Sequence, residues 1–487
     1  MCDVKEIKNY INGVFVEPKS GKFIESLCPA TGLINAKVPS SETSDVDDAV
    51  QSAKQAFYGW SNTSPQDRCN IMRRIADILE SRLDEFAQLE SQDQGKPVTL
   101  ATSVDIPRAI YNFRFFASVI LHETDDCTHL TNPTNALNYV HRMPVGVAGL
   151  ISPWNLPLYL LTWKIAPAIA FGNTCVAKPS EFTSVTAWKL CEVFTQAELP
   201  PGVVNIVFGD GPTAGEAIVK HKDVSVISFT GSTAVGHHIS EVVAPLCKPV
   251  SLELGGKNAA LVFGDANLDD CVQCCVRSSF ANQGEICLCT SRIYVDSTIY
   301  EEFVAKFVQR TKLLKVGDPD DKSTNVGALI SKQHWEKVKH YINIARDDGG
   351  KIECGDGVEQ LRLPQRVKGG FFIQPTVVTG VDDSSRCVQD EIFGPVVCIM
   401  PFNTEEEAVK RSNAVKYGLC ATVWTSDLAR AHRVSKKLEA GTVWVNCWMV
   451  RDLNMPFGGM KQSGIGRESA KHSAEFFTEA KTVCIKY

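Results

Sequence analysis

Val145-Gly146-Val147-Ala148-Gly149-Leu150-Ile151 is the first of four short β-rich runs that alternate with helical segments in the middle of the chain. The other three runs are residues 174–177, 203–208 and 224–229. Strands that alternate with helices favour a doubly wound parallel sheet, because a parallel pair needs a long crossover that is usually a helix. The sequence therefore predicts an α/β domain in this region.

A second series of the same kind predicts a second α/β domain further along the chain. Before the first series, residues 10–16 are typical of a hairpin, and a helix is expected after the capping-box pattern from Ser44 to Asp47. Another helix is expected from Ser64 to Gly95. The expected fold is thus α/β, with two doubly wound, Rossmann-like domains. The β-rich runs of the second series are residues 292–295, 396–400, 421–424 and 441–445.

Composition and charge indicate a protein that acts on small molecules. The chain has 487 residues, of which 44% are hydrophobic and 22% charged, and its net charge is -6. Lys and Arg are dispersed, so we expect no nucleic-acid partner and no anionic membrane surface. Residues 1–8 alternate in charge without the apolar run of a signal peptide, and no stretch reaches the roughly 18 apolar residues of a membrane span. A cytoplasmic location is expected.

The 18 cysteines are scattered along the chain and are expected to be reduced. The alternative is a zinc site, which the spacing of Cys271, Cys274 and Cys275 suggests. These three lie in a predicted helix, and neither a histidine nor a second C-x-x-C pair completes a tetrahedral site. No metal is expected.

Three residues together suggest covalent acyl chemistry. Cys287 is a candidate nucleophile, since a thiolate attacks a carbonyl readily and is a good leaving group. Glu253 is a candidate general base, and Asn155, in the segment from Pro153 to Pro157, is a candidate N–H donor to a developing oxyanion. Each residue also has a simpler interpretation: Cys287 as a buried inert thiol, Glu253 as a surface carboxylate and Asn155 as a structural amide. Their combination favours the catalytic interpretation.

Two glycine-containing turns between a strand and a helix favour a nucleotide site. In the segment from Gly209 to Gly215, which includes Gly211, the last spacing is one residue too long for G-x-G-x-x-G, so a tight turn is an equal alternative. The second turn, Phe229-Thr230-Gly231-Ser232, opens a helix whose N-terminus suits a pyrophosphate. Lys178 and Glu181 follow another β run, where a carboxylate repels a 2′-phosphate and favours NAD over NADP, although a solvated turn is the plainer alternative.

These motifs, taken with Glu391-Ile392-Phe393-Gly394-Pro395 and Pro456-Phe457-Gly458-Gly459, resemble the NAD(P)-dependent aldehyde dehydrogenases over nearly the whole chain. The resemblance implies a NAD-binding domain, a catalytic domain and a small β element that bridges subunits of a homodimer or homotetramer. The implied boundaries are 1–124 and 145–256 for the NAD-binding domain, 257–469 for the catalytic domain, and 125–144 and 470–487 for the oligomerisation element.

The resemblance also implies a role for each matched residue. Cys287 would be the nucleophile, Asn155 and the Cys287 backbone N–H the oxyanion hole, and Glu253 the base that activates water, with Lys164 in support. NAD is the implied cofactor, and hydrolysis of a Cys287 thioester would release the acid. Three departures from the family pattern, Glu285, Cys289 and Asp390, remove no required group. The implied cofactor-binding residues are Lys178 and Glu181 for the adenine ribose, Gly211, Phe229, Gly231 and Ser232 around the pyrophosphate, Glu391 for the nicotinamide ribose and Phe393 near the nicotinamide.

The substrate expectation depends on two arginines, Arg108 and Arg451, at positions that line the substrate entrance in this family. Two guanidiniums suit a carboxylate, so a semialdehyde that carries one is expected, with Trp163 and Phe457 also lining the site. Surface arginines in salt bridges are the alternative. Three alternatives compete with this function. The chain could oxidise retinal or another apolar aldehyde, transfer the acyl group to coenzyme A, or be a non-enzymatic structural protein on this fold.

Overall fold

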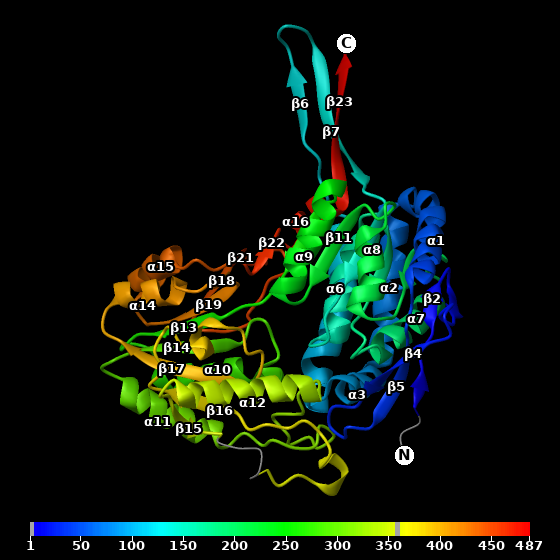
Figure 1. The fold of residues 1–487 in the computed structure, drawn as a ribbon. Helices are drawn as coiled ribbons and strands as arrows, with labels where there is room; N and C mark the ends of the chain where they lie inside the picture. The colour runs from blue at the N-terminus through cyan, green and yellow to red at the C-terminus, as the bar shows by residue number, and fades with distance from the viewer. Residues whose placement is uncertain (1–3, 356–360) are drawn as a thin grey trace.

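Two separate sheets form the centres of two lobes, and a narrow β arm projects from one of them (Figure 1). The structure is a computed structural model that describes residues 4–355 and 361–487. The prediction that the chain has no signal peptide depends on residues 1–8, and residues 1–3 of this segment lie outside the described residues. The predicted α/β class with two wound sheets is confirmed.

The first sheet contains eight strands in the order β22-β12-β11-β8-β9-β10-β2-β3. Its five central strands are parallel, and β22 and β2 pair with them in antiparallel fashion. The chain moves outward from β8 through β9 and β10, then returns to place β11 and β12 on the other side, so the strand order reverses between β8 and β11. Ligands of such sheets bind outside the carboxyl ends of the strands at this reversal. The strands are β2 (Asn9–Ile11), β3 (Val14–Val16), β8 (Val147–Ile151), β9 (Thr174–Lys178), β10 (Val204–Ile206), β11 (Val226–Thr230), β12 (Val250–Glu253) and β22 (Gly464–Ile465).

The second sheet contains seven strands in the order β15-β16-β17-β14-β13-β19-β20, all parallel except β15. Every β-rich run that predicted the two sheets is a strand, with bounds that differ by a few residues. Two smaller sheets join β1 (Lys5–Glu6), β4 (Phe23–Leu27) and β5 (Ile34–Pro39), and β18 (Tyr417–Gly418) with β21 (Met460–Lys461). The second-sheet strands are β13 (Asn258–Val262), β14 (Thr290–Asp296), β15 (Lys351–Cys354), β16 (Thr376–Thr379), β17 (Val396–Phe402), β19 (Cys420–Trp424) and β20 (Thr442–Val445).

The helices of the first lobe begin where the sequence supplies caps. The predicted cap of α1 is wrong by two residues, since Glu42 and Asp45 form the capping box in place of Ser44 and Asp47. The predicted helix from Ser64 to Gly95 is two helices, because the backbone leaves helical geometry at Arg82. The helices are α1 (Thr43–Ser61), α2 (Pro65–Ser81), α3 (Leu83–Gln94), α4 (Val98–Leu100), α5 (Ile106–Val119), α6 (Pro157–Ala170), α7 (Val185–Gln196), α8 (Glu216–Lys220) and α9 (Thr233–Val243), with short turns η1 (Ala101–Asp105), η2 (Gly211–Gly215) and η3 (Ala244–Leu246).

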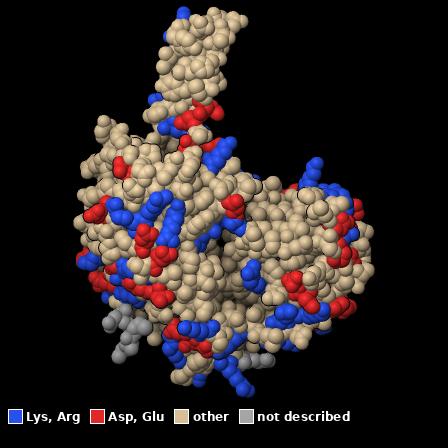
Figure 2. All heavy atoms as spheres, turned by 180° about the vertical axis from the view of Figure 1, so that it is seen from behind, with Lys and Arg blue, Asp and Glu red and all other residues tan. Residues whose placement is uncertain are grey.

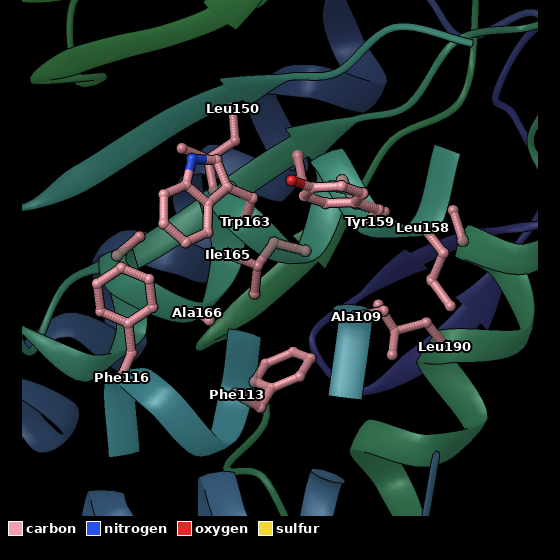
Figure 3. Packing of buried hydrophobic residues seen from close by; sticks show 14 of the residues in the cluster. Ala109, Phe113, Phe116, Leu150, Leu158, Tyr159, Trp163, Ile165, Ala166 and Leu190 are labelled. Atoms are coloured by element: carbon pink, nitrogen blue, oxygen red, sulfur yellow. The ribbon is translucent and has the colours of Figure 1, made fainter. Parts of the chain in front are cut away.

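Helix α6 lies at the centre of the largest apolar core, where it packs against α5 (Figure 3). The Phe116 and Trp163 rings lie 5.4 Å apart between these helices. Burying aromatic rings of this size contributes a large share of core stability, so α6 is held rigidly. The remaining helices are α10 (Leu268–Phe280), α11 (Tyr300–Thr311), α12 (Lys332–Asp347), α13 (Arg386–Gln389), α14 (Glu405–Asn413), α15 (Leu428–Lys437) and α16 (Ala470–Phe477), with turns η4 (Ala281–Gly284) and η5 (Gln365–Val367).

The projecting arm is a three-stranded antiparallel sheet of β6 (Cys127–Leu130), β7 (Ala136–Pro144) and β23 (Thr478–Lys486), in the order β23-β7-β6. Strand β23 pairs with β7 from Thr478 against Pro144 to Lys486 against Ala136. The two outer edges of the arm, on β6 and β23, have no neighbouring strand within the described chain. The domain boundaries expected from the sequence stay predictions.

Lys and Arg mix with Asp and Glu over the face shown in Figure 2, and this face is hollowed between the two lobes. In residues 4–355 and 361–487, no helix combines the length and apolar character that a membrane crossing requires. Nor does any group of three or more His, Cys, Asp or Glu side chains in this part of the chain come together as a metal site.

Candidate active site

A cavity of about 190 Å³ lies where the strand order of the first sheet reverses. The loop after β8 contributes Trp154 and Asn155, and the turn after β11 contributes Gly231 and Ser232. Cys287 enters from the second lobe. The structure thus brings together six of the residues selected from the sequence: Asn155, Gly231, Ser232, Cys287, Glu391 and Phe393.

The loop that presents Cys287 has an unusual backbone. Asn282 and Gln283, in η4, have φ values of 50° and 58°, which non-glycine residues rarely adopt. Gly284 follows with φ 74°, and a Cβ there would lie 2.4 Å from the Gly394 carbonyl carbon, so only glycine fits. This tight path turns Cys287 toward the cavity.

Burial raises the pKa of the Cys287 thiol well above its usual value, and the Glu253 and Glu391 carboxyl groups raise it further. Arg451 acts in the opposite direction. Cys289 is also buried, and burial raises its pKa to about 12. Both thiols are therefore predominantly protonated in the free protein, and attack by Cys287 requires loss of its proton.

Asn155 is linked to the nucleophile loop by several hydrogen bonds. Its side-chain Nδ2 donates to the Glu285 carbonyl at 2.9 Å, which uses one of its two N–H groups. Its own carbonyl accepts from Lys96 Nζ at 3.1 Å and from Asn282 Nδ2 at 3.0 Å. Lys96 in turn is fully buried in an ion pair with Asp105. The amide is thus held in place while one N–H is left for a ligand.

Glu285, the residue two before the nucleophile, is fully buried. Its carboxyl accepts from Gln94 Nε2 at 2.8 Å and from the Ile330 N–H at 3.1 Å, and burial raises its pKa well above the usual value. A protonated Glu285 is close in shape to the commoner Gln, so this departure from the family pattern keeps the packing beneath the loop.

Glu253 ends β12, and its side chain is 5% exposed. Its Oε1 has no hydrogen-bond partner. Burial raises the pKa of the carboxyl well above its usual value, and the neighbouring Glu468 adds to the shift. Lys164 lies near both acids, donates to Ser228 Oγ at 2.9 Å and lies 3.6 Å from Glu468. A buried carboxyl with an unpartnered oxygen and a raised pKa is suited to general-base chemistry near neutral pH.

One end of the cavity has the features of a nicotinamide ribose site. Glu391 Oε1 accepts from the Gly256 N–H at 2.9 Å, and a Cβ at Gly255 would lie 2.3 Å from Glu391 Oε2, so glycine is required there. Phe393 and Trp154 form an aromatic wall, with ring centroids 5.3 Å apart. The wall leaves a flat face against which a planar ring can stack.

The other end has the features of a pyrophosphate site. Ser232 caps α9, whose free N–H groups and dipole favour an anion. Gly231 lies against the Phe229 ring, where a Cβ would approach to 2.4 Å. A side chain at this position would clash with the ring, so glycine is required. Lys178 donates to the Gly209 carbonyl at 2.7 Å and lies 3.6 Å from Glu181. Lys178, Glu181 and Gly211 do not line the cavity around Cys287, and Gly211 is open to solvent.

Arg108 and Arg451 lie close together over the same ring. Their Cζ atoms are 5.6 Å and 5.0 Å from the centre of the Trp163 ring, and Arg451 Nη1 donates to the Tyr159 hydroxyl at 3.3 Å. Arg451 also lies over Phe457 at 3.8 Å. Within the described residues neither arginine pairs with an acid, and the Nη2 atom of each is buried without a hydrogen-bond partner. Burial lowers the pKa of Arg108, and the charge of Arg451 lowers it further.

Three site residues were missed by sequence reasoning. Glu468 bonds the Trp163 indole N–H and faces Lys164. His334, whose pKa burial lowers to about 4, and Lys337 line the cavity from α12. Lys337 Nζ donates to the Glu391 carbonyl at 3.2 Å. None belongs to a recognisable motif, although the amphipathic pattern of residues 332–347 could have indicated the helix that carries two of them.

Comparison with known proteins identifies the class that this fold and site define. The profile of the Aldehyde dehydrogenase family matches residues 15–483, so the chain belongs to this family. The chain is 58% identical over 481 residues to the 2-aminomuconic semialdehyde dehydrogenase of Danio rerio, covering 99% of this chain and 98% of that protein. It is 48% identical over 487 residues to the 2-hydroxymuconic semialdehyde dehydrogenase of Pseudomonas sp. (strain CF600), covering 99% of this chain and 100% of that protein.

Among solved structures, an NAD⁺ complex of an aldehyde dehydrogenase from Bacillus cereus is 38% identical and superposes with a TM-score of 0.95, covering 99% of this chain and 97% of that chain. The fold and the family membership therefore rest on agreement over nearly the full length. The family assignment disfavours the alternative of a structural protein that only shares the fold.

Proposed function

We propose that this chain oxidises 2-aminomuconic semialdehyde to 2-aminomuconate with NAD as the electron acceptor. The names of the most similar relatives support a muconic semialdehyde, and the solved NAD⁺ complex of a relative supports the cofactor. The single observation that carries the substrate class is the Arg108 and Arg451 pair, which has three buried, unpartnered guanidinium nitrogens and no acid partner in the described chain. A substrate carboxylate supplies the missing partner.

Four residues, of which Asn155 and Cys287 line the cavity, divide the chemistry among them. Loss of the thiol proton from Cys287 produces the nucleophile that attacks the aldehyde carbon. The free N–H of Asn155 donates to the oxygen that gains charge, a contribution on the order of 10²–10³ in rate for one such donor. The attack gives a thiohemiacetal, which becomes a thioester once its hydride has passed to the electron acceptor. Glu253 takes the proton of the water that hydrolyses this thioester, and Lys164 stabilises the carboxylate form of that base.

NAD, when bound, supplies the hydride acceptor. The Ser232 helix terminus would hold its pyrophosphate, and Glu391 its nicotinamide ribose, with Phe393 and Trp154 restricting the position of the ring. Lys178 and Glu181 would bond the adenine ribose. Glu181 lies where a 2′-phosphate would be repelled, which supports NAD over NADP.

A substrate panel tests this function. The rate of NADH formation is measured with 2-aminomuconic semialdehyde, 2-hydroxymuconic semialdehyde, retinal and hexanal under identical conditions. We expect the highest kcat/KM with 2-aminomuconic semialdehyde. Higher kcat/KM values with retinal or hexanal would refute the carboxylate preference and leave the aldehyde dehydrogenase chemistry intact.

The arm supports a further part of the proposal, that the protein is a homodimer or homotetramer. The free edges of β6 and β23 present unpaired backbone groups, which a sheet of a second subunit can satisfy. The proposed location is the cytoplasm, in keeping with the many free thiols of the described chain.

A further inference from the structure

A second cavity, of about 460 Å³, lies apart from the cavity around Cys287 and shares no lining residue with it. Its volume falls within the range of roughly 300–1,000 Å³ that small-molecule sites occupy. One wall comes from the segment that runs through α4 into η1, another from α10, and a third from the end of α11. The floor is formed by Ala281 and Asn282, at the start of the nucleophile loop.

The lining of this cavity is mostly apolar, and arginines give one side of it a positive charge. Leu100, Val276 and Phe280 contribute to the apolar walls, and Leu313, at 77% exposure, extends them outward. Among the described residues no Asp or Glu lines the cavity, whereas two arginines, Arg277 and Arg310, do. Apolar walls with charge of one sign favour an amphipathic anion.

Within the part of the chain that the structure describes, neither arginine forms an ion pair. Arg277 Nη2 donates to the Trp448 carbonyl at 3.2 Å, and its guanidinium lies over the Trp448 ring at 5.6 Å. In residues 4–355 and 361–487, no carboxylate pairs with Arg277 or with Arg310. Arg277 is therefore positioned by a neutral partner and keeps its charge available, and Arg310 is a second exposed cation beside the same space.

The floor of this cavity connects directly to the catalytic machinery. Asn282 is 1% exposed, its Oδ1 has no hydrogen-bond partner, and its Nδ2 donates to the Asn155 carbonyl at 3.0 Å. Pro97, in another wall, follows Lys96, whose Nζ donates to the same carbonyl at 3.1 Å. One floor residue of the cavity, Asn282, and the chain neighbour of one wall residue, Lys96, thus donate to the same backbone oxygen of Asn155.

We propose that this cavity is a second ligand site, which takes a small organic monocarboxylate with an apolar body and modulates the active site through Asn282. The apolar walls would bury the body of the ligand, and Arg277 and Arg310 would bind its carboxylate. A ligand pressed against the Ala281 and Asn282 backbone would shift the loop that carries Cys287 and the bond that holds Asn155. The site lies outside the proposed substrate and NAD positions.

Direct binding of octanoate to the full-length protein, measured by isothermal titration calorimetry without cofactor, tests the site. The matched uncharged probe is octanamide. We expect octanoate to bind and octanamide to bind more weakly. Arg310→Gln should weaken octanoate binding by roughly fivefold. Leu313→Asp, which places a negative charge at the rim, should weaken it at least as much.

Arg108→Gln is the control, because octanoate could instead enter the substrate site through Arg108 and Arg451. We expect this variant to bind octanoate as the parent protein does. No octanoate binding by the parent protein would overturn the proposal. So would binding that is lost in Arg108→Gln and retained in both Arg310→Gln and Leu313→Asp. These outcomes do not depend on which aldehyde the enzyme oxidises.

Kinetics with hexanal as substrate test the coupling. We expect octanoate to change kcat with little effect on KM, and Arg310→Gln to reduce this effect while leaving the rate without octanoate unchanged. A purely competitive pattern against hexanal, or an effect that Arg310→Gln does not alter, would overturn the proposed coupling through Asn282.

Discussion

Lys164 Nζ lies 3.6 Å from Glu468 Oε1, although the two residues are far apart in sequence and come from α6 and the segment before α16. Both side chains lie next to the Glu253 carboxyl, which Glu468 disfavours and Lys164 favours in its charged form. Trp163, the neighbour of Lys164 on α6, holds the other oxygen of Glu468 through its indole N–H. Burial is the largest cause of the raised pKa of the proposed base, and the Lys164 and Glu468 pair adjusts it and couples it to the wall of the substrate site.

Glu468→Gln should shift the pH dependence of deacylation to lower pH. The charge of Glu468 raises the pKa of Glu253, and removing it also leaves Lys164 free to favour the Glu253 carboxylate. Because the base acts when ionised, the acidic limb of the rate profile should move down. The measurement is the pH dependence of single-turnover thioester hydrolysis. An acidic limb that moves up would contradict the coupling, and so would one that stays in place.

Glu253→Gln should stop the reaction at the thioester. Hydrolysis of the thioester needs the base, whereas formation of NADH comes earlier, so about one NADH per site should form rapidly and steady turnover should fall by on the order of 10²–10⁴. Rapid-mixing absorbance gives both the burst and the steady rate. Steady turnover equal to that of the parent protein would show that another group is the base.

Cys287→Ser should abolish formation of the acyl-enzyme, since a serine hydroxyl at this position lacks the acidity and nucleophilicity of a thiol. Cys289→Ser is the matched control and should retain turnover, because Cys289 is buried and does not line the cavity that contains Asn155 and Cys287. Intact-protein mass spectrometry after mixing with the aldehyde and NAD detects the adduct. An adduct in Cys287→Ser that disappears in Cys289→Ser would reverse the assignment.

Arg108→Gln and Arg451→Gln should each raise KM for 2-aminomuconic semialdehyde by roughly tenfold, the size expected for loss of one charge-assisted hydrogen bond. KM for hexanal, which has no carboxylate, should change little. Because the two guanidiniums lie over the same Trp163 ring, the double variant should be less than additive. Equal changes in KM for both aldehydes would indicate lost packing and would refute a carboxylate clamp.

Deletion of residues 481–487 should reduce the size of the assembly in solution. These residues form most of β23, whose outer edge is free in the single chain. Light scattering after size-exclusion chromatography reports the mass, and deletion of Tyr487 alone is the control. An unchanged mass after the longer deletion would show that the arm does not join the subunits.

The regular elements of both sheets could be predicted from the sequence because their determinants are local. Runs such as residues 145–151 and 224–229 are rich in β-branched residues, and Ser64 and Pro65 mark a helix start without any tertiary contact. The local signal was less reliable at Arg82, where the apolar stripe continues across a break in the backbone. An apolar stripe indicates which face of a helix is buried, but it does not show where a single residue leaves helical geometry.

The α/β class, the family and a set of candidate reactive side chains could be predicted from the sequence, because the residue types and spacings of Asn155, Glu253 and Cys287 indicate their chemistry. The surroundings that tune these side chains depend on contacts made in the folded chain. The Lys164 and Glu468 pair joins segments distant in sequence, and so do the hydrogen bonds from Lys96 and Asn282 to Asn155. Within the described chain, the folded arrangement also leaves Arg108 without a neighbouring acid. Electrostatic energies depend on distance and burial, and neither quantity is written in the order of residues.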